Sequence, residues 1–253
     1  MLIDSHAHLD FPQFDAERAQ LFAQMRQANI AGAVIPAVER QYWSRVQQIA
    51  EQYHCRYGLG IHPWYMAPER IEDDISALDS ALKQGKMESS LVAIGETGLD
   101  TRKGPALSIQ LDYVNHHIEL AQRYQLPLIL HCVKAHNALL ACLDAHTGIR
   151  GVIHGFSGSL ELAQRYIRLG FFIGVGGLLL KDNARKLQYT VTQLPVNKIV
   201  VETDSPSMSP IPGQSSTPLL LPCVVEKIAC LQKKTSVSIY EQLSVNASQL
   251  FER

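Results

Sequence analysis

The chain has 253 residues, of which 46% are hydrophobic, and 23 basic residues nearly balance 24 acidic ones to give a formal net charge of −1. This length suffices for one large buried core, and the near-zero charge argues against a general attraction to nucleic acid or to an anionic membrane, so that any polyanion site must be local. The five cysteines are scattered and include no Cys-x-x-Cys, which argues against a disulfide framework and a structural zinc knuckle.

The sequence shows neither the pattern of a signal peptide nor that of a membrane-spanning helix. The N-terminus has no basic segment followed by an apolar stretch, and no apolar run approaches the eighteen or so residues of a membrane-spanning helix. We expect a cytoplasmic protein with no membrane association, and nothing in the sequence indicates an obligate protein partner.

Short apolar runs alternate with longer amphipathic stretches along the whole chain, which is typical of βα units around a parallel sheet. The pattern predicts eight strands, at residues 2–6, 32–38, 56–61, 91–96, 127–132, 151–154, 171–175 and 198–203. It predicts helices at 17–29, 43–53, 71–84, 108–124, 136–145, 160–169 and 183–193, followed by a helical tail at 219–253. This order favours an α/β fold, a (β/α)8 TIM barrel that forms a single domain over residues 1–253, with an open doubly wound sheet as the alternative.

The first strand ends in His6 and His8, which a single small residue separates. On a strand, side chains two residues apart point to the same face, so both imidazoles can reach one metal ion. A solvated turn near the N-terminus would explain a lone His-x-His equally well. The residues at the ends of the later strands are needed to distinguish the two explanations.

Metal-capable side chains also close four of the later predicted strands. They are Glu96 on the fourth, His131 on the fifth, His154 on the sixth and Asp204 after the eighth. Each alone has a structural explanation, such as a core histidine or a turn carboxylate. Six such groups at one end of a barrel are harder to explain without a cation, because burying several ionisable groups together is unfavourable.

Four imidazoles and two carboxylates are typical ligands of zinc, manganese or nickel, and magnesium is a further alternative. The set is large enough for two divalent ions roughly 3.5 to 4 Å apart. We expect His6, His8 and Asp204 at one ion and His131 and His154 at the other, with Glu96 between them. The ions would lower the pKa of a bound water to about 7, and Asp204 would orient that water and receive its proton. Glu96 and Asp204 are therefore the predicted catalytic residues.

Six segments in order carry a family resemblance. They read Asp-Ser-His-Ala-His-Leu-Asp at 4–10, Gly-Ile-His-Pro at 60–63, Gly-Glu-Thr-Gly-Leu-Asp at 95–100, Leu-His-Cys at 130–132, His-Gly-Phe-Ser-Gly at 154–158 and Glu-Thr-Asp-Ser-Pro at 202–206. This series resembles the TatD-type metal-dependent hydrolases of the amidohydrolase-like superfamily. The resemblance implies a TIM barrel, metal ligation by the same six residues with the glutamate in the bridging place, and deoxyribonuclease activity, often as a 3′ to 5′ exonuclease.

Substrate contacts are less well defined, because the chain departs from the family pattern there. Lys134 stands near where the fifth motif often has an arginine, and the loop 205–218 contains no Arg or Lys. Nucleases gain much of their affinity from such cations, so their absence weakens the nuclease interpretation. We predict substrate contacts at His62, Arg102 and Lys134, with DNA or another phosphodiester as the partner. The alternatives are hydrolysis of a small amide, lactone or ester, and a metal-binding scaffold without turnover.

Overall fold

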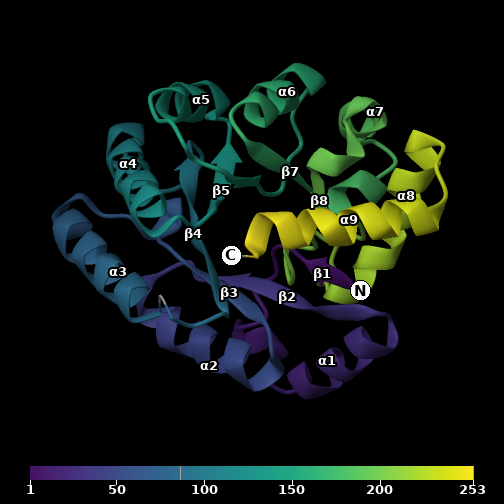
Figure 1. Ribbon diagram of the computed structural model, residues 1–253, viewed down its shortest axis with the longest axis horizontal. Coiled ribbons are helices and arrows are strands. Elements are labelled where there is room, and N and C mark those ends of the chain that lie inside the picture. Colours follow the sequence, from purple (N-terminus) through teal and green to yellow (C-terminus); the bar gives the residue numbers. More distant parts are fainter. Residues whose placement is uncertain (86, 253) are drawn as a thin grey trace.

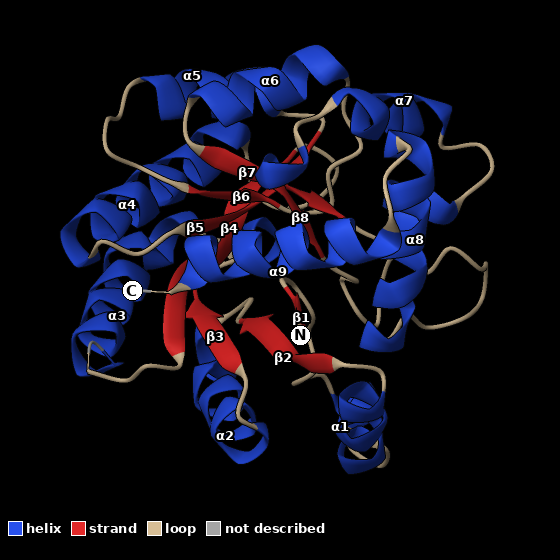
Figure 2. Cartoon of the chain, turned by 45° about the vertical axis from the view of Figure 1, so that its right-hand side comes forward, coloured by secondary structure: helices blue, strands red, loops and turns tan. Residues whose placement is uncertain are grey.

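The computed structural model describes residues 1–85 and 87–252. These residues form eight strands that are hydrogen-bonded in chain order, and helices alternate with them (Figures 1 and 2). The strands are β1 (Leu2–Asp4), β2 (Ile30–Pro36), β3 (Arg56–Leu59), β4 (Leu91–Asp100), β5 (Leu128–Val133), β6 (Gly151–Ile153), β7 (Phe171–Val175) and β8 (Ile199–Val201). The predicted TIM barrel is confirmed, and the open-sheet alternative is wrong.

The helices cover the outside of this barrel. They are α1 (Arg18–Gln27), α2 (Trp43–Tyr53), α3 (Ile71–Gly85), α4 (Leu107–Tyr124), α5 (His136–Asp144), α6 (Leu160–Arg168), α7 (Arg185–Gln193), α8 (Leu221–Gln232) and α9 (Ser236–Phe251). Short 3-10 helices lie at Pro12–Phe14, Arg40–Tyr42, Pro63–Tyr65, Pro68–Arg70, Gly177–Leu180, Val196–Lys198 and Pro218–Leu220. No helix of the described residues is both long enough and apolar enough to cross a membrane.

All seven strand pairs in chain order are parallel, and polar contacts join the last strand to the first. The amide of Ser5 donates to the carbonyl of Val201 at 3.0 Å, and the amide of Thr203 donates to Oδ1 of Asp4 at 3.0 Å. Asp4 is fully buried, and burial raises the pKa of its carboxyl to about 7 against the opposing hydrogen bonds from Thr203 and His6. The carboxyl of Asp4 therefore helps to close the barrel.

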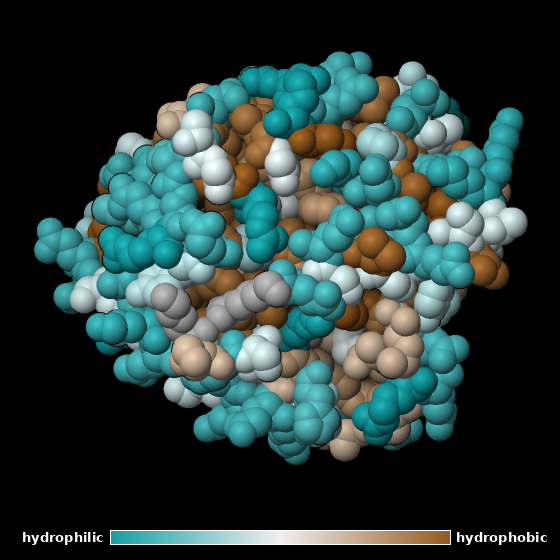
Figure 3. Space-filling view, in the orientation of Figure 1, coloured by the Kyte–Doolittle hydropathy of each residue, from teal (hydrophilic) through white to brown (hydrophobic). Residues whose placement is uncertain are grey.

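The helix α9 covers the N-terminal end of the barrel. Its last residues, Leu250 and Phe251, are buried against inward-facing strand side chains such as Val34, Val92 and Ile129. Figure 1 looks onto this end, with α9 in yellow in front of the strands, and Figure 3 shows mostly hydrophilic residues on the same face with hydrophobic ones between them. The catalytic face of such a barrel is the opposite one, where the strands end.

The predicted helical tail is two helices. The first, α8, ends at Gln232 and is followed by Lys233, whose φ of 53° is left-handed. The side chain of Thr235 caps α9 by accepting a hydrogen bond from the amide of Ser238. A left-handed residue followed by a Thr N-cap ends one helix and starts the next. The chain can therefore turn and place α9 across the barrel.

The fourth strand is longer than predicted. It continues from the expected end at Glu96 to Asp100, with residues 97–100 pairing with β5 from Leu130 to Val133. The extension matters for function because residues two apart on a strand share a face. Glu96 and Asp100 therefore point to the same side.

Candidate metal centre

The structure brings the six predicted metal ligands together at the C-terminal end of the barrel. His6 and His8 follow β1, Glu96 and His131 lie within β4 and β5, His154 follows β6, and Asp204 lies three residues beyond β8. Five of the six are at most 9% exposed, and His131 is partly buried. These side chains come together because each lies within or shortly after a strand of the same parallel barrel.

Glu96 lies at the middle of the cluster, and its two carboxylate oxygens face different partners. Oε2 is 3.3 Å from Nε2 of His6 and 3.4 Å from Nε2 of His8. Oδ1 of Asp204 is 3.4 Å from each of the same two nitrogens. His6, His8, Asp204 and one oxygen of Glu96 thus form one donor group.

The other oxygen of Glu96 faces a second donor group. Oε1 is 2.9 Å from Nε2 of His154 and 3.2 Å from Nδ1 of His131. Nε2 of His62 is 3.3 Å from the same oxygen. Glu96 is therefore in a position to bridge two groups of ligands.

The spacing of the nitrogens within each group fits a cation. Nε2 of His6 and Nε2 of His8 are 3.2 Å apart, and Nδ1 of His131 and Nε2 of His154 are 3.1 Å apart. Two nitrogens that bind one tetrahedral ion at about 2.1 Å stand roughly 3.4 Å apart. His6, His8 and Glu96, and likewise His62, Glu96 and His131, could each hold a metal ion.

Electrostatics in the cluster favour added positive charge. Burial alone would raise the pKa of Glu96, but the neighbouring His154, His62 and His6 hold it well below its usual value. Burial lowers the pKa of His154, but the charge of Glu96, its hydrogen bond and the charges of Asp204 and Glu202 together outweigh burial and raise that pKa to about 9. Two buried carboxylates thus favour protonation of His8 and His154, and divalent cations would satisfy the same demand.

His62, which we predicted to contact substrate, lies directly against the clustered ligands. The amide of Trp64 donates to Nδ1 of His62 at 3.2 Å, which leaves Nε2 to carry the proton and donate to Glu96. Burial lowers the pKa of His62 to about 3, so the ring is neutral. His62 also lines a cavity of about 140 Å³ over the cluster, together with His8, Phe11, Val38, Trp64, Tyr65, Glu96, His131, His154, Asp204 and Ser207.

Asp100 is a functional candidate that the sequence reasoning quoted within a motif but assigned no role. Its Oδ2 lies 3.2 Å from Nε2 of His131 and accepts a hydrogen bond from Nε1 of Trp64 at 2.9 Å. Such a carboxylate fixes the tautomer of a ligating histidine, leaving the opposite nitrogen free for a metal. Asp100 lies four residues after Glu96, a spacing that puts both side chains on one face if the strand continues. The predicted strand ended at Glu96, so this relationship was not recognised.

Glu202 is a second residue without a predicted role. Its Oε1 accepts a hydrogen bond from the amide of Gly155, and its Oε2 is buried without a hydrogen-bond partner among the described residues. Glu202, His6 and His154 each offer one atom, and these atoms lie within 4.8 Å of one another. Burial raises the pKa of Glu202 to about 8. A Cβ at Gly174 would lie 2.4 Å from Oε2, so glycine there makes room for this carboxyl group.

The predicted cationic substrate contacts lie outside the cavity. Arg102 and Lys134 are exposed in the loops after β4 and β5, and neither lines the space over the cluster. Nζ of Lys103 is 4.0 Å from the centre of the Trp64 ring, which is 44% exposed. The positive charge near the site is therefore at its rim.

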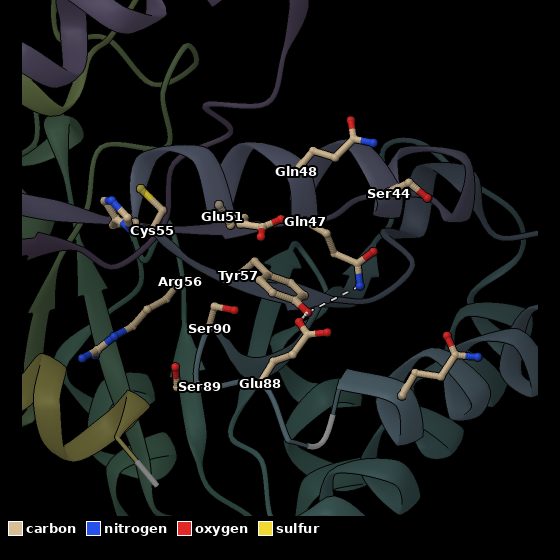
Figure 4. Close-up of a pocket in the computed structure, with 13 residues that line it drawn as sticks. Ser44, Gln47, Gln48, Glu51, Cys55, Arg56, Tyr57, Glu88, Ser89 and Ser90 are labelled. Atoms are coloured by element: carbon tan, nitrogen blue, oxygen red, sulfur yellow. Dashed lines mark hydrogen bonds between the residues drawn. The ribbon is translucent and has the colours of Figure 1, made fainter.

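A larger cavity, of about 960 Å³, lies at the other end of the strands (Figure 4). Its lining includes Arg56 and Tyr57, where β3 begins, and Ser89 and Ser90, which precede β4. The hydroxyl of Tyr57 donates to Glu88 at 2.6 Å. This polar cavity contains none of the six clustered residues, so its size does not make it the functional site.

Comparisons with known proteins show what the chain is similar to. The family model described as TatD related DNase matches residues 3–252. The chain is 34% identical over 254 residues to the uncharacterized metal-dependent hydrolase YjjV of Escherichia coli K12, covering 98% of this chain and 97% of that protein. The crystal structure of that TatD homologue superposes with a TM-score of 0.91, at 32% identity, over 99% of this chain and 97% of the other. The chain is also 27% identical over 262 residues to a protein of Pantoea sp. named 3′-5′ ssDNA/RNA exonuclease TatD, covering 99% of each.

Proposed function

The chain belongs to the TatD-related DNase family of metal-dependent hydrolases, and from this premise we propose that it hydrolyses phosphodiester bonds of DNA, from the 3′ end. The observation that carries the proposal is the position of Glu96, whose two oxygens face two separate groups of donors. These two donor groups would hold two metal ions, which would support the displacement of one oxygen by another at phosphorus. The relative named as a 3′-5′ exonuclease supports the same chemistry.

The residues divide between two ion positions. His6, His8 and Asp204 would hold one ion with Oε2 of Glu96, and His131 and His154 would hold the other with Oε1. When bound, zinc, manganese, nickel or magnesium would lower the pKa of a water and polarise the phosphoryl oxygen.

Asp204 is the proposed proton acceptor. Burial would raise its pKa, but the hydrogen bond with His8 and the charges of His6 and His154 hold that pKa below its usual value. The carboxylate also lines the cavity over the cluster, where the attacking water and the substrate would meet. Asp204 would thus orient the water and take its proton as the bond to phosphorus forms. The leaving oxygen would depart on the opposite side with the electron pair of its bond to phosphorus and take up a proton from solvent.

A small amide, lactone or ester is the second candidate substrate. It is favoured by the lining of the 140 Å³ cavity, whose described residues include no Lys or Arg. A carbonyl substrate would use the same activated water but would need no cation to neutralise a nucleic-acid backbone.

The test is turnover after metal removal and addition. The chain would be stripped with a chelator and assayed with Mn²⁺, Zn²⁺, Ni²⁺ or Mg²⁺ against labelled single-stranded DNA and against a panel of lactones and amides. We expect stepwise shortening of DNA from the 3′ end that is lost in Glu96→Gln and Asp204→Asn and retained in Glu241→Gln, an exposed residue of α9. Hydrolysis confined to the carbonyl compounds would favour the second candidate, and ion binding without hydrolysis would favour a scaffold.

A further inference from the structure

A second cavity adjoins the metal centre. It has a volume of about 610 Å³ and is lined by Asp10, Phe11, Pro12, Gln13, Val38, Tyr42, Arg45 and Tyr65. Three of these residues, Phe11, Val38 and Tyr65, also line the 140 Å³ cavity over the clustered ligands. We call this second cavity the aromatic groove. The two cavities are therefore neighbours that have three lining side chains in common.

Aromatic rings lead from the metal centre into the groove. The ring of Phe11 stacks on His8, with centroids 4.8 Å apart and an interplanar angle of 18°. The ring of Tyr65 meets His62 at 65°, with centroids 6.4 Å apart. Farther along, Tyr42 is 37% exposed and lines the groove but not the metal-centre cavity. The groove thus offers partly exposed ring faces beside the reacting centre.

Charge in the groove is unsuited to a second phosphate. Among the described residues that line the two cavities, Arg45 is the only lysine or arginine, and its Nε donates to the carbonyl of Asp10 at 2.6 Å while its Nη2 is paired with Asp15. The rim cations Arg102, Lys103 and Lys134 line neither cavity. A polyanion backbone gains affinity by neutralising phosphates, and this groove offers little for that purpose.

We infer that the aromatic groove binds the nucleobase next to the scissile phosphate, so that the enzyme recognises one terminal nucleotide and not a long stretch of backbone. This inference rests on the proposed phosphodiesterase function. The groove volume is within the range of small-molecule sites, and sequence-tolerant stacking is the usual way in which aromatic side chains hold single-stranded bases. The phosphate would face the clustered ligands, and the base would lie among Phe11, Tyr42 and Tyr65.

The test compares two phosphodiesters with the same leaving group. Thymidine 5′-(4-nitrophenyl phosphate) carries a base, and methyl 4-nitrophenyl phosphate does not. With the metal-loaded protein we expect kcat/KM to be roughly 5- to 150-fold higher for the nucleoside diester, the factor that stacking of one base supplies. In Tyr42→Ala this ratio should fall toward one. Tyr189→Ala, which removes a tyrosine that is 61% exposed on α7 and lines neither cavity, should leave the ratio unchanged.

Binding separates failure of the inference from failure of the proposed function. Calorimetric titration of the metal-loaded protein with thymidine 5′-monophosphate and with methyl phosphate should show the same preference, and Tyr42→Ala should lose it. If neither diester is hydrolysed but the binding preference is present, the phosphodiesterase function is wrong, whereas the inference that the aromatic groove binds a nucleobase is supported. Equal affinity for the two monophosphates, or a preference that survives in Tyr42→Ala, overturns the groove whether or not turnover occurs.

Discussion

The indole Nε1 of Trp64 donates a hydrogen bond to Oδ2 of Asp100 at 2.9 Å. The same oxygen lies 3.2 Å from Nε2 of His131, whose opposite nitrogen faces Glu96. An exposed rim residue, a buried carboxylate and a candidate ligand are thus joined in one chain of hydrogen bonds.

Asp100→Asn should weaken metal binding at the His131 side of the centre by roughly 10- to 100-fold, because a neutral amide holds the imidazole less firmly and favours the same tautomer less strongly than a carboxylate does. Metal titration by calorimetry measures the loss. Asp112→Asn, on the exposed surface of α4, is the matched control and should bind as the parent does. Equal affinity in Asp100→Asn and the parent would show that Asp100 does not orient a ligand.

Glu202→Gln should also lower the number of ions retained per chain. The glutamine oxygen can still accept the Gly155 amide, but its N–H donors would face Nδ1 of His6 and of His154, which have no hydrogen-bond partner among the described residues. A histidine that binds metal through one nitrogen donates from the other, so an acceptor is needed there. We expect a 10- to 100-fold loss of affinity, measured by competition with a chromogenic chelator. Unchanged retention of metal ions in Glu202→Gln would show that Glu202 does not support metal binding.

The barrel could be predicted from the sequence because eight short apolar runs alternate with amphipathic stretches, and the six clustered residues because each follows or ends such a run. Asp100 was missed because β4 continues past Glu96, and nothing in the periodicity marks that extension. The aromatic groove was missed for another reason. Phe11 and Tyr42 lie in or beside short 3-10 helices, whose positions in space depend on packing and not on a repeating pattern.

Removal of metal should lower the thermal stability of the protein. Without cations, the buried carboxylates of Glu96 and Asp204 lose their compensating charge. A ligand present at 100 times its Kd stabilises the native state by about 2.7 kcal/mol, which corresponds to roughly 5 to 10 °C in Tm for a chain of this size. Differential scanning fluorimetry with Zn²⁺ and with excess chelator measures the difference. In Glu96→Gln the two curves should nearly coincide, and a full shift in that variant would mean that the ions bind elsewhere.

Phe251→Ala should destabilise the fold without changing the metal centre. Phe251 is 2% exposed and packs with Leu250 against the strand residues at the N-terminal end of the barrel. Loss of a buried phenylalanine costs about 3 to 5 kcal/mol because a cavity remains. Chemical denaturation measures this loss, and the metal affinity of the folded variant should equal that of the parent. Val237→Ala, at a residue of α9 that is 68% exposed, should change stability by less than about 0.5 kcal/mol.

His117 should make stability depend on pH between about 4 and 6.5. Its Nδ1 donates to the carbonyl of Tyr113 at 2.7 Å and its Nε2 accepts the amide of Ile61 at 3.2 Å, so the neutral ring satisfies both partners. Burial lowers the pKa of His117 to about 4, whereas the unfolded chain binds the proton near pH 6.5. The stabilisation is therefore fully present above pH 6.5 and is lost as the pH falls toward 4, by at most about 1.4 kcal/mol per pH unit.

Urea denaturation of chelator-treated protein at pH 7.5 and pH 5 tests this dependence. Chelation removes any contribution from pH-dependent metal binding, and other titrating groups cancel when variants are compared. The loss of unfolding free energy between the two pH values should be up to about 2 kcal/mol smaller in His117→Gln than in the parent. Gln122→Ala, at a side chain of the same helix that does not titrate, should lose as much unfolding free energy between the two pH values as the parent does. Identical losses in His117→Gln and the parent would mean that His117 takes up its proton as easily in the native barrel as in the unfolded chain.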